Sequence, residues 1–338
     1  MRRVLITGST GFIGRRMVRL LRSMPSDSQP ETIRCLVRAT SNRDDIDSFD
    51  VEIVVGDLSD EHALRHAVSN CDYVINFAGT TKALGKRGFR SANVIGPDRI
   101  AKACAAQDSP PTLVHVSSLA AAGPSVRGKP RTEAEKPSPV SNYGRSKREG
   151  EEQLLRYCQH VPISIVRPPI VLGPGDRDGF ELFRSIAKFG IHLIPGFQSQ
   201  EVSLVHSDDL CNAVLRIAEQ GERLGETEGE GVYFVADPTP VRYDRLGELI
   251  ASTLGRRRVW KLRFPLAGIW AVASVNEAVS RIHGRPHILN FDKGREASAG
   301  SWACDSGKFQ AAFGDPVALP LADRLTEIAE WYRERGWI

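Results

Sequence analysis

Three regularly spaced glycines near the start of the chain constrain its fold more than any other feature. Gly8, Gly11 and Gly14 lie in TGSTGFIG, which follows the apolar run RRVLIT and opens a helical pattern. The first glycine allows a tight turn, the second a close approach of the backbone to a phosphate, and the third close packing of helix on strand. The spacing is weak as an isolated pattern, but between a strand and a helix it predicts a phosphate-binding loop.

The first half of the chain alternates apolar runs with helical patterns. We expect helices around residues 13–23, 61–69, 91–107 and 143–158 between runs rich in Val, Ile and Leu. Such runs suit strands that are covered on both faces, so we predict an α/β fold with a doubly wound parallel sheet of the Rossmann type. The predicted strands are RRVLIT, TIRCLVR, VEIVV, DYVINFA, TLVHVSS and ISIVRPP.

The pattern changes after about residue 172, where Gly and Pro cluster and helices dominate. We assign residues 1–172 to a nucleotide-binding domain and residues 173–338 to a smaller, mostly helical substrate lobe. Because VSLVH and VYFVA are again apolar, we expect the two parts to be interleaved, with returns to the main sheet near 202–220 and 231–236.

Composition excludes several classes of protein. A net charge of +4 is too small to indicate nucleic-acid binding, and the six cysteines include no CxxC pair. We therefore expect reduced thiols, no metal site and a cytoplasmic protein without a secretory signal. The most apolar segment, residues 264–274, is too short to span a bilayer. It is interpreted as a buried helix, with a substrate cap or a membrane-surface contact as alternatives.

The end of the second predicted strand bears on the choice of dinucleotide. An acidic residue there would bind the ribose hydroxyls of NAD, whereas this strand ends at Arg38 and is followed by Arg43, with no acid before Asp44. A guanidinium favours the extra phosphate of NADP, so NADP(H) is the preferred cofactor and NAD the alternative. Asp57, after the third strand, is expected at the adenine edge, and the turn Asn76–Gly79 at the cofactor cleft.

A second group of polar residues follows the fifth predicted strand. Ser117 and Ser118 end that strand, and Tyr143 and Lys147 lie four residues apart at a predicted helix start. That spacing places both side chains on one helix face. Because functional groups gather at the carboxyl ends of parallel strands, Ser118 and Tyr143 are expected to converge.

The motifs TGSTGFIG, NFAG, VSSLAAAG, YGRSK and RPPIVLGPGD occur in the order seen in the extended short-chain dehydrogenase/reductases, which this chain resembles over most of its length. The resemblance implies that Tyr143 is the acid–base residue, Lys147 its activator and Ser118 the partner of the substrate oxygen. It further implies that Asn93 supports the active-site helix. The expected cofactor contacts, beside those named above and together with Tyr143 and Lys147, are Thr10, Phe12, Ile13, Leu58, Phe77, Ala78, Gly79, Pro168 and Ile170.

Elementary electrostatics agrees with this role. A free phenol has a pKa near 10, and we expect the Lys147 ammonium and an oxidised nicotinamide ring to lower the pKa of Tyr143. In the reducing direction Tyr143 would protonate a carbonyl oxygen that Ser118 holds in place.

The reaction can be narrowed by what the motifs lack. The family's dehydratases carry an Asp-Glu pair after the catalytic Ser or Thr, whereas Leu119 and Ala120 follow Ser118 here. Its epimerases usually retain NAD with an acidic residue closing the second strand, which Arg38 argues against. We therefore predict a carbonyl/alcohol oxidoreductase. An NAD-dependent sugar-nucleotide epimerase and a non-catalytic NADP(H)-binding protein stay as alternatives.

The second half of the chain gives two conflicting indications of the substrate. Apolar residues near the predicted pocket are interpreted first as a lobe core, with an apolar carbonyl substrate as the alternative, whereas several arginines suggest an anionic substrate. We also expect a homodimer through the helices near 91–107 and 143–158. The apolar residues are Trp260, Phe264, Leu266, Ile269 and Trp270, and the arginines are Arg177, Arg256 and Arg257.

Overall fold

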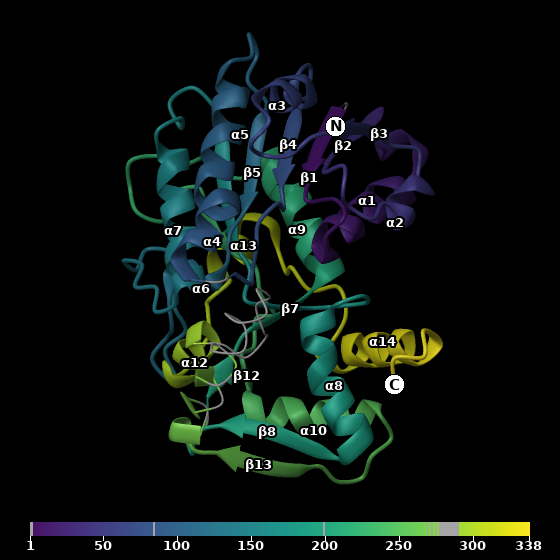
Figure 1. Cartoon of the computed structure of the whole chain (residues 1–338), viewed down its shortest axis with the longest axis vertical. Coiled ribbons are helices and arrows are strands. Elements are labelled where there is room, and N and C mark those ends of the chain that lie inside the picture. Colours follow the sequence, from purple (N-terminus) through teal and green to yellow (C-terminus); the bar gives the residue numbers. More distant parts are fainter. Residues whose placement is uncertain are drawn as a thin grey trace.

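The structure, a computed structural model, describes residues 3–83, 85–198, 200–268, 270–271, 273–274, 276 and 291–338. Its centre is a seven-stranded sheet in the order β11-β6-β5-β4-β1-β2-β3, and all neighbours in it run parallel (Figure 1). The six strands predicted in the first half are confirmed. The strands are β1 (Arg3–Thr7), β2 (Thr32–Val37), β3 (Glu52–Val55), β4 (Tyr73–Asn76), β5 (Thr112–Val116), β6 (Ile163–Arg167) and β11 (Val232–Phe234).

Helices cover both faces of this sheet, which confirms the doubly wound prediction. Alternate residues of β1 point to opposite faces: Val4 and Ile6 join one buried cluster, and Leu5 joins another. The first cluster includes α1 (Phe12–Ser23) and α9 (Ser207–Gln220). The second includes α3 (Glu61–Val68), α5 (Gly96–Ala105) and α7 (Asn142–Leu155).

The helix predicted over 91–107 is divided. A π-helical turn, η2 (Ser91–Ile95), joins α4 (Gly85–Arg90) to α5. Such turns are rare and often lie at functional sites. The remaining short helices around the sheet are η1 (Ser26–Ser28), α2 (Asp44–Asp47) and α6 (Leu119–Ala122).

The second half of the chain adds a strand to the main sheet at one of the two expected places. β11 pairs with β6, as predicted near 231–236. The strand expected near 202 is wrong as part of that sheet: β10 (Leu204–His206) pairs with β7 (Ile170–Leu172) instead. Pro168 and Pro169 separate β6 from β7, because prolines lack the N–H needed to continue a strand in the sheet. Of residues 202–220, α9 lies against the main sheet as a covering helix.

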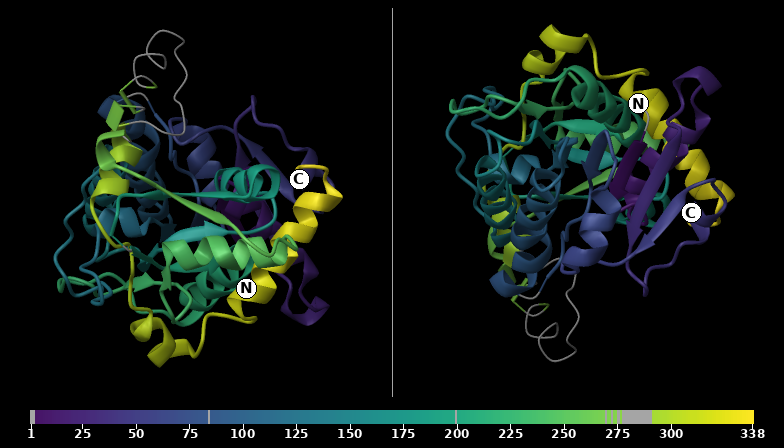
Figure 2. Two further views of the ribbon diagram at one scale, coloured as in Figure 1. Left: turned by 90° about the horizontal axis from the view of Figure 1, so that it is seen from below. Right: turned by 90° about the horizontal axis from the view of Figure 1, so that it is seen from above.

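The smaller lobe has a hydrophobic core of its own. Phe183, Ile250, Leu325 and Tyr332 are among its buried residues. Figure 2 shows from two further sides how the C-terminal segments run along both parts of the molecule. Its elements are α8 (Arg177–Phe189), β8 (Ile191–Pro195), β9 (Glu201–Val202), β12 (Val241–Arg242), α10 (Tyr243–Thr253), β13 (Trp260–Phe264), α12 (Phe291–Ser298) and α14 (Leu321–Glu334). Helix α13 (Gly307–Phe313) packs instead on the main sheet, because Phe309 belongs to the buried cluster of Val4 and Ile6.

The apolar segment 264–274 is helical at its described positions from Leu266 onward, as predicted, but it is buried only in part. Phe264 ends β13, and both it and Leu266 are exposed at 38%, whereas Ala273 is buried. Trp260 is 78% exposed, so its assignment to a lobe core is also wrong, while Ile269 lies outside the described residues. Nothing in sequence spacing reveals whether another element covers an apolar strand. Among the described residues, no helix is long and apolar enough to cross a membrane.

Candidate active site

The glycine loop joins β1 to α1 in the geometry that its spacing predicts. Gly8 has φ +71°, and a Cβ on it would lie 2.7 Å from the Ala78 nitrogen. A Cβ on Gly14 would collide with the Gly8 carbonyl oxygen. The backbone N–H of Gly11 donates to that same oxygen at 2.9 Å. Gly11 is the residue before α1, and no described side chain caps this helix start. The first backbone N–H groups of α1 can therefore bind an anion.

A buried polar network fixes the carboxyl ends of the central strands. The Thr7 hydroxyl donates to Asn76 Oδ1 at 2.6 Å, which also accepts from the Ala78 N–H at 3.0 Å. Asn76 Nδ2 lies 2.8 Å from His115 Nδ1. Burial holds the pKa of His115 well below its usual range, so the ring is neutral and Nδ1 accepts from the amide. The turn after β4 is thereby held against the glycine loop.

Ser118 and Tyr143 meet at the carboxyl end of β5. Ser118 caps α6, and its Oγ accepts from the Ala120 N–H at 3.1 Å. Ser118 lies close enough to Tyr143 to lower the pKa of the phenol. Ser117 is buried instead beside Glu151. Of the two serines, Ser118 is therefore the one beside the tyrosine.

The electrostatics of Tyr143 differ from the sequence-based expectation. Burial raises the pKa of Tyr143 above its ordinary value, although the nearby Ser118 and the charge of Lys293 lower it in part. The expectation that Lys147 lowers this pKa is wrong for the structure, because the Lys147 ammonium points to the Val116 carbonyl. The phenol is consequently in its proton-donating form at neutral pH.

Lys147 lies one turn along α7 and is almost completely buried. Its Nζ donates to the Val116 carbonyl oxygen at 2.9 Å, and a Cβ on Gly79 would lie 3.6 Å from that Nζ. Burial lowers the pKa of Lys147 to about 8, against the opposing charge of Glu151. This lysine is thus a cation that loses its charge near the physiological range.

A buried ion pair lies beneath the lysine. Arg167 on β6 holds Glu151 on α7 through two hydrogen bonds, Nε to Oε1 at 2.9 Å and Nη2 to Oε2 at 2.7 Å. Burial opposes ionisation of Glu151, but the adjacent guanidinium lowers its pKa below the ordinary value. The i,i+4 spacing of Lys147 and Glu151 was visible in the sequence, whereas the pairing with Arg167 was not.

Asn93 connects the π-helical turn to the active-site helix. Its side-chain amide donates to Ser146 Oγ on α7 and to the Thr80 carbonyl, both at 2.9 Å. Its Oδ1 accepts from the Thr80 N–H at 2.8 Å. A Cβ on Gly150 would collide with the Asn93 carbonyl oxygen. These contacts place η2 and the 79–80 turn in one fixed arrangement with α7.

Helix α12 supplies residues that no sequence motif indicated. Asp292 accepts the backbone N–H groups of Asn142 and Tyr143 at 3.1 and 3.0 Å, so it caps the start of α7. Lys293 lies close enough to Tyr143 that its charge lowers the pKa of the phenol, while Tyr143 raises the pKa of the lysine. Its Nζ is 2.8 Å from the Glu296 carboxylate. The C-terminal part of the chain therefore builds one side of the site.

The residues expected around the adenosine half lie at the edge of the sheet. Arg38 is exposed, and its charge adds to the two Ser59 hydrogen bonds that lower the pKa of Asp57. Arg43 is 3.8 Å from Asp47 in an exposed turn. The other predicted contacts divide into half-buried, buried and exposed positions. Thr10, Phe12, Ile13, Leu58, Phe77 and Ala78 are half-buried, Pro168 is buried with its carbonyl bonded to the Leu119 N–H, and Ile170 is exposed.

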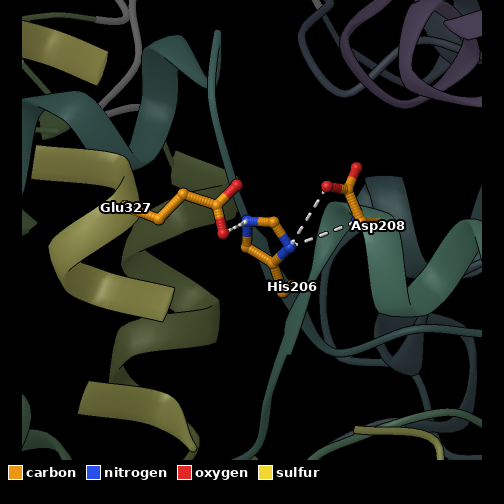
Figure 3. A group of neighbouring side chains, drawn as sticks. All are labelled: His206, Asp208 and Glu327. Carbon is orange, nitrogen blue, oxygen red and sulfur yellow. Dashed lines mark hydrogen bonds and ion pairs between the residues drawn. The ribbon is translucent and has the colours of Figure 1, made fainter. Parts of the chain in front are cut away.

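A separate titratable group contains His206, Asp208 and Glu327 (Figure 3). Both carboxylates already have cationic partners: Arg16 Nε is 2.7 Å from Asp208, and Arg324 is 2.9 Å from Glu327. Burial, followed by the charge of Arg324, lowers the pKa of His206. The Arg16 bond joins α1 to α9, and Arg324 joins α14 to α9 because it also donates to Asp209 at 2.6 Å. We therefore interpret the group as a connection between helices.

The fold and the glycine loop define an α/β oxidoreductase of the extended short-chain dehydrogenase/reductase type. The model of the NAD dependent epimerase/dehydratase family matches residues 4–234, and the chain belongs to this family.

Relatives of known activity cover nearly the whole chain. The ceramide reductase of Caulobacter vibrioides is 30% identical over 99% of this chain and 96% of its own length. The 2-alkyl-3-oxoalkanoate reductase of Stenotrophomonas maltophilia is 25% identical, covering 86% and 87% of the two chains. The solved dTDP-glucose 4,6-dehydratase of Streptomyces venezuelae, with NAD bound, has a TM-score of 0.77 at 22% identity, covering 100% and 98%. That structural likeness bears on the fold alone.

Proposed function

We propose that the chain is an NADP(H)-dependent reductase that converts an apolar carbonyl compound into a secondary alcohol. The observation that carries the proposal is the proximity of Ser118 to Tyr143, with buried Lys147 one turn beyond Tyr143 on α7. Two hydroxyl donors beside a buried cation suit the protonation of a carbonyl oxygen.

The residues at the glycine loop fit a dinucleotide. Side chains at Gly8 or Gly14 would collide with the backbone, and the uncapped start of α1 offers N–H donors to a pyrophosphate. Arg38 at the end of β2 would bind a 2′-phosphate. A bound nicotinamide would supply the hydride for carbonyl reduction.

The chain's own groups would handle the proton and the oxygen. Tyr143, held protonated by burial, donates its proton to the carbonyl oxygen as negative charge develops there. Ser118 holds that oxygen in line by donating a hydrogen bond. The Lys293 charge stabilises the resulting tyrosinate.

The substrate class rests on the relatives. A ceramide reductase that matches nearly the full length supports an apolar, lipid-like carbonyl compound. The absence of an acidic pair after Ser118 disfavours elimination, because Leu119 and Ala120 are buried apolar residues. Epimerisation of a sugar nucleotide stays the second candidate, since the family model includes epimerases.

Replacing Tyr143 by Phe tests the catalytic role. We expect kcat for NADPH oxidation to fall by roughly 10²–10⁴-fold, the usual contribution of general acid catalysis, with NADPH affinity nearly unchanged. Tyr157→Phe is the matched control, because Tyr157 lies just beyond α7 and its hydroxyl donates to Asp98 at 3.0 Å, away from Tyr143. Substantial turnover by Tyr143→Phe would refute the role.

The reaction type is tested with two substrate panels. Long-chain ketones should consume NADPH, whereas UDP-sugars should be neither reduced nor epimerised. Epimerisation of a UDP-sugar without net NADPH consumption would establish the second candidate instead. Tight NADPH binding without turnover of either panel would indicate a non-catalytic binding protein.

The cofactor preference is tested at the end of β2. Arg38→Ala should reduce the ratio of the NADPH affinity to the NADH affinity by about tenfold or more, because a charge-assisted bond to the 2′-phosphate is lost. Arg19→Ala, an exposed charge change on α1, is the control. An unchanged ratio in Arg38→Ala would contradict the assignment.

We further propose the homodimer expected through α5 and α7. The two helices lie next to one another on one side of the main sheet, where Lys102 and Glu149 are exposed (Figure 1). Light scattering of the purified chain gives the oligomeric state, and a monomer at all concentrations would refute this proposal.

A further inference from the structure

The two-stranded sheet of β8 and β13 lies at the end of the smaller lobe, away from the main sheet (Figure 1). Its strands are parallel, and their register pairs Trp260 with Ile191, Leu262 with Leu193 and Phe264 with Pro195. Because side chains alternate along a strand, these six apolar residues share one face.

That face is open to solvent over much of its area. Trp260 is 78% exposed, Leu193 51% and Leu262 49%. Phe189 and Phe197, which flank β8, are exposed at 70% and 71%. Monomeric proteins rarely leave contiguous apolar surface of this kind without an interaction partner. We name it the apolar face; its members are Phe189, Ile191, Leu193, Pro195, Phe197, Trp260, Leu262, Phe264 and Leu266.

The opposite face of the same sheet is turned toward α10. Lys261 pairs there with Glu248, and Arg263 lies 3.9 Å from Asp244. His192 packs against Tyr243 with ring centroids 4.9 Å apart. The carboxylates close to these strands are therefore engaged beneath the sheet and not on the apolar face.

The segments that form the apolar face carry only positive charge. Residues 182–200 and 249–275 contain no Asp or Glu. Arg257 and Arg258 are exposed in the turn that leads into Trp260, and Lys188 is exposed immediately before Phe189. The basic residues of the two segments are Arg184, Lys188, Arg256, Arg257, Arg258, Lys261 and Arg263.

We propose that the apolar face docks on the surface of a membrane that contains anionic lipids. Exposed aromatic residues prefer the boundary between headgroups and acyl chains, and adjacent arginines are attracted to anionic headgroups. Charge complementarity favours this occupant over a second copy of the chain, because two identical basic surfaces would repel one another. The docking is independent of the proposed reaction and is measured without substrate or cofactor.

Vesicle flotation with the full chain tests the proposal. The chain should float with phosphatidylcholine vesicles that contain phosphatidylglycerol, and should bind far less to phosphatidylcholine alone or in high salt. Brominated acyl chains should quench tryptophan emission, and this quenching should be largely lost in Trp260→Phe. No flotation with either vesicle would overturn the proposal.

Two pairs of variants separate the apolar and charge contributions. Trp260→Ser/Leu262→Ser should bind at least tenfold more weakly, whereas Val126→Ser/Leu319→Ser, at exposed apolar positions elsewhere, should bind as the wild type does. Arg257→Gln/Arg258→Gln should lose roughly fivefold in affinity for each charge, given the usual contribution of one basic residue. Its control of equal charge is Arg127→Gln/Lys129→Gln, also at exposed positions.

The same variants identify other occupants. Equal weakening by the control pairs would show that binding is non-specific and would overturn the proposal. If Trp260→Ser/Leu262→Ser instead converts a dimer into a monomer in sedimentation, the apolar face is an interface between copies. Circular dichroism and urea midpoints should be unchanged in every variant, since all these positions are exposed.

Discussion

Breaking the buried ion pair between Glu151 and Arg167 should destabilise the protein strongly. Their side chains are exposed by only 1% and 0%, and two hydrogen bonds join them. Replacing Glu151 with Met leaves the Arg167 charge buried without its partner, and such changes cost roughly 3–5 kcal/mol in the free energy of unfolding.

The reverse change should cost less. In Arg167→Met the Glu151 carboxylate keeps a second cation, because Arg148 Nη1 lies 3.4 Å away. Replacing both residues by Met removes both buried charges and keeps apolar volume, so the double variant should lose less stability than the sum of the single losses.

Urea unfolding followed by circular dichroism gives these free energies, provided that the m-values of the variants agree. The exposed pair of Arg90 and Glu149, 3.9 Å apart on the neighbouring surface, supplies the control: Glu149→Met should change stability by less than about 1 kcal/mol. Additive single losses, or a Glu151→Met variant within about 1 kcal/mol of the wild type, would refute the reasoning.

Two further predictions concern α7. The alkaline limb of kcat/KM should have a pKa near 8 and should move lower in Glu151→Gln, because burial lowers the pKa of Lys147 to about 8 and Glu151 opposes that shift. The unfolded chain binds more protons at Lys147 than the folded chain between pH 8 and its ordinary pKa of 10.5, so this residue makes stability rise with pH there. As the pH rises through this window, the urea midpoint of the wild type should increase relative to that of Lys147→Met. A constant difference between the two midpoints would contradict the pKa shift. Asp292→Ala should lower the free energy of unfolding by about 1–2 kcal/mol and reduce kcat, because the backbone N–H groups of Asn142 and Tyr143 lose their acceptor. Asp292→Asn keeps one acceptor oxygen and should lose less. Equal stability of the wild type and both variants would refute the capping role.

Short-range patterns predicted much of the fold. The alternation of apolar runs with helical segments correctly gave six parallel strands and their covering helices, because strand and helix periods are local properties. The Pro168-Pro169 pair was visible in the sequence, yet the pairing of β7 with β10 depends on which strand lies nearby in space. Local pattern could not assign the strand at 204–206 to its partner.

Some residues of the candidate site were predicted from the sequence, and others were found only in the tertiary structure. Gly8 and Gly14, and the Ser118, Tyr143 and Lys147 set, were predicted because their spacing on a turn or a helix fixes where they point. Asp292 and Lys293, by contrast, follow Tyr143 by well over a hundred residues and reach it only through packing of α12.

The sequence alone thus determined the glycine loop, the parallel sheet and the four-residue spacing of Tyr143 and Lys147, all set by local backbone geometry. The tertiary structure decided the charge environment of these residues and the exposure of Trp260. Both depend on which distant segments pack against a residue: α12 beside Tyr143 adds a cation, whereas the outer face of β13 is left uncovered. Sequence spacing contains no record of such packing, so composition assigned Trp260 to a core that the fold does not build around it.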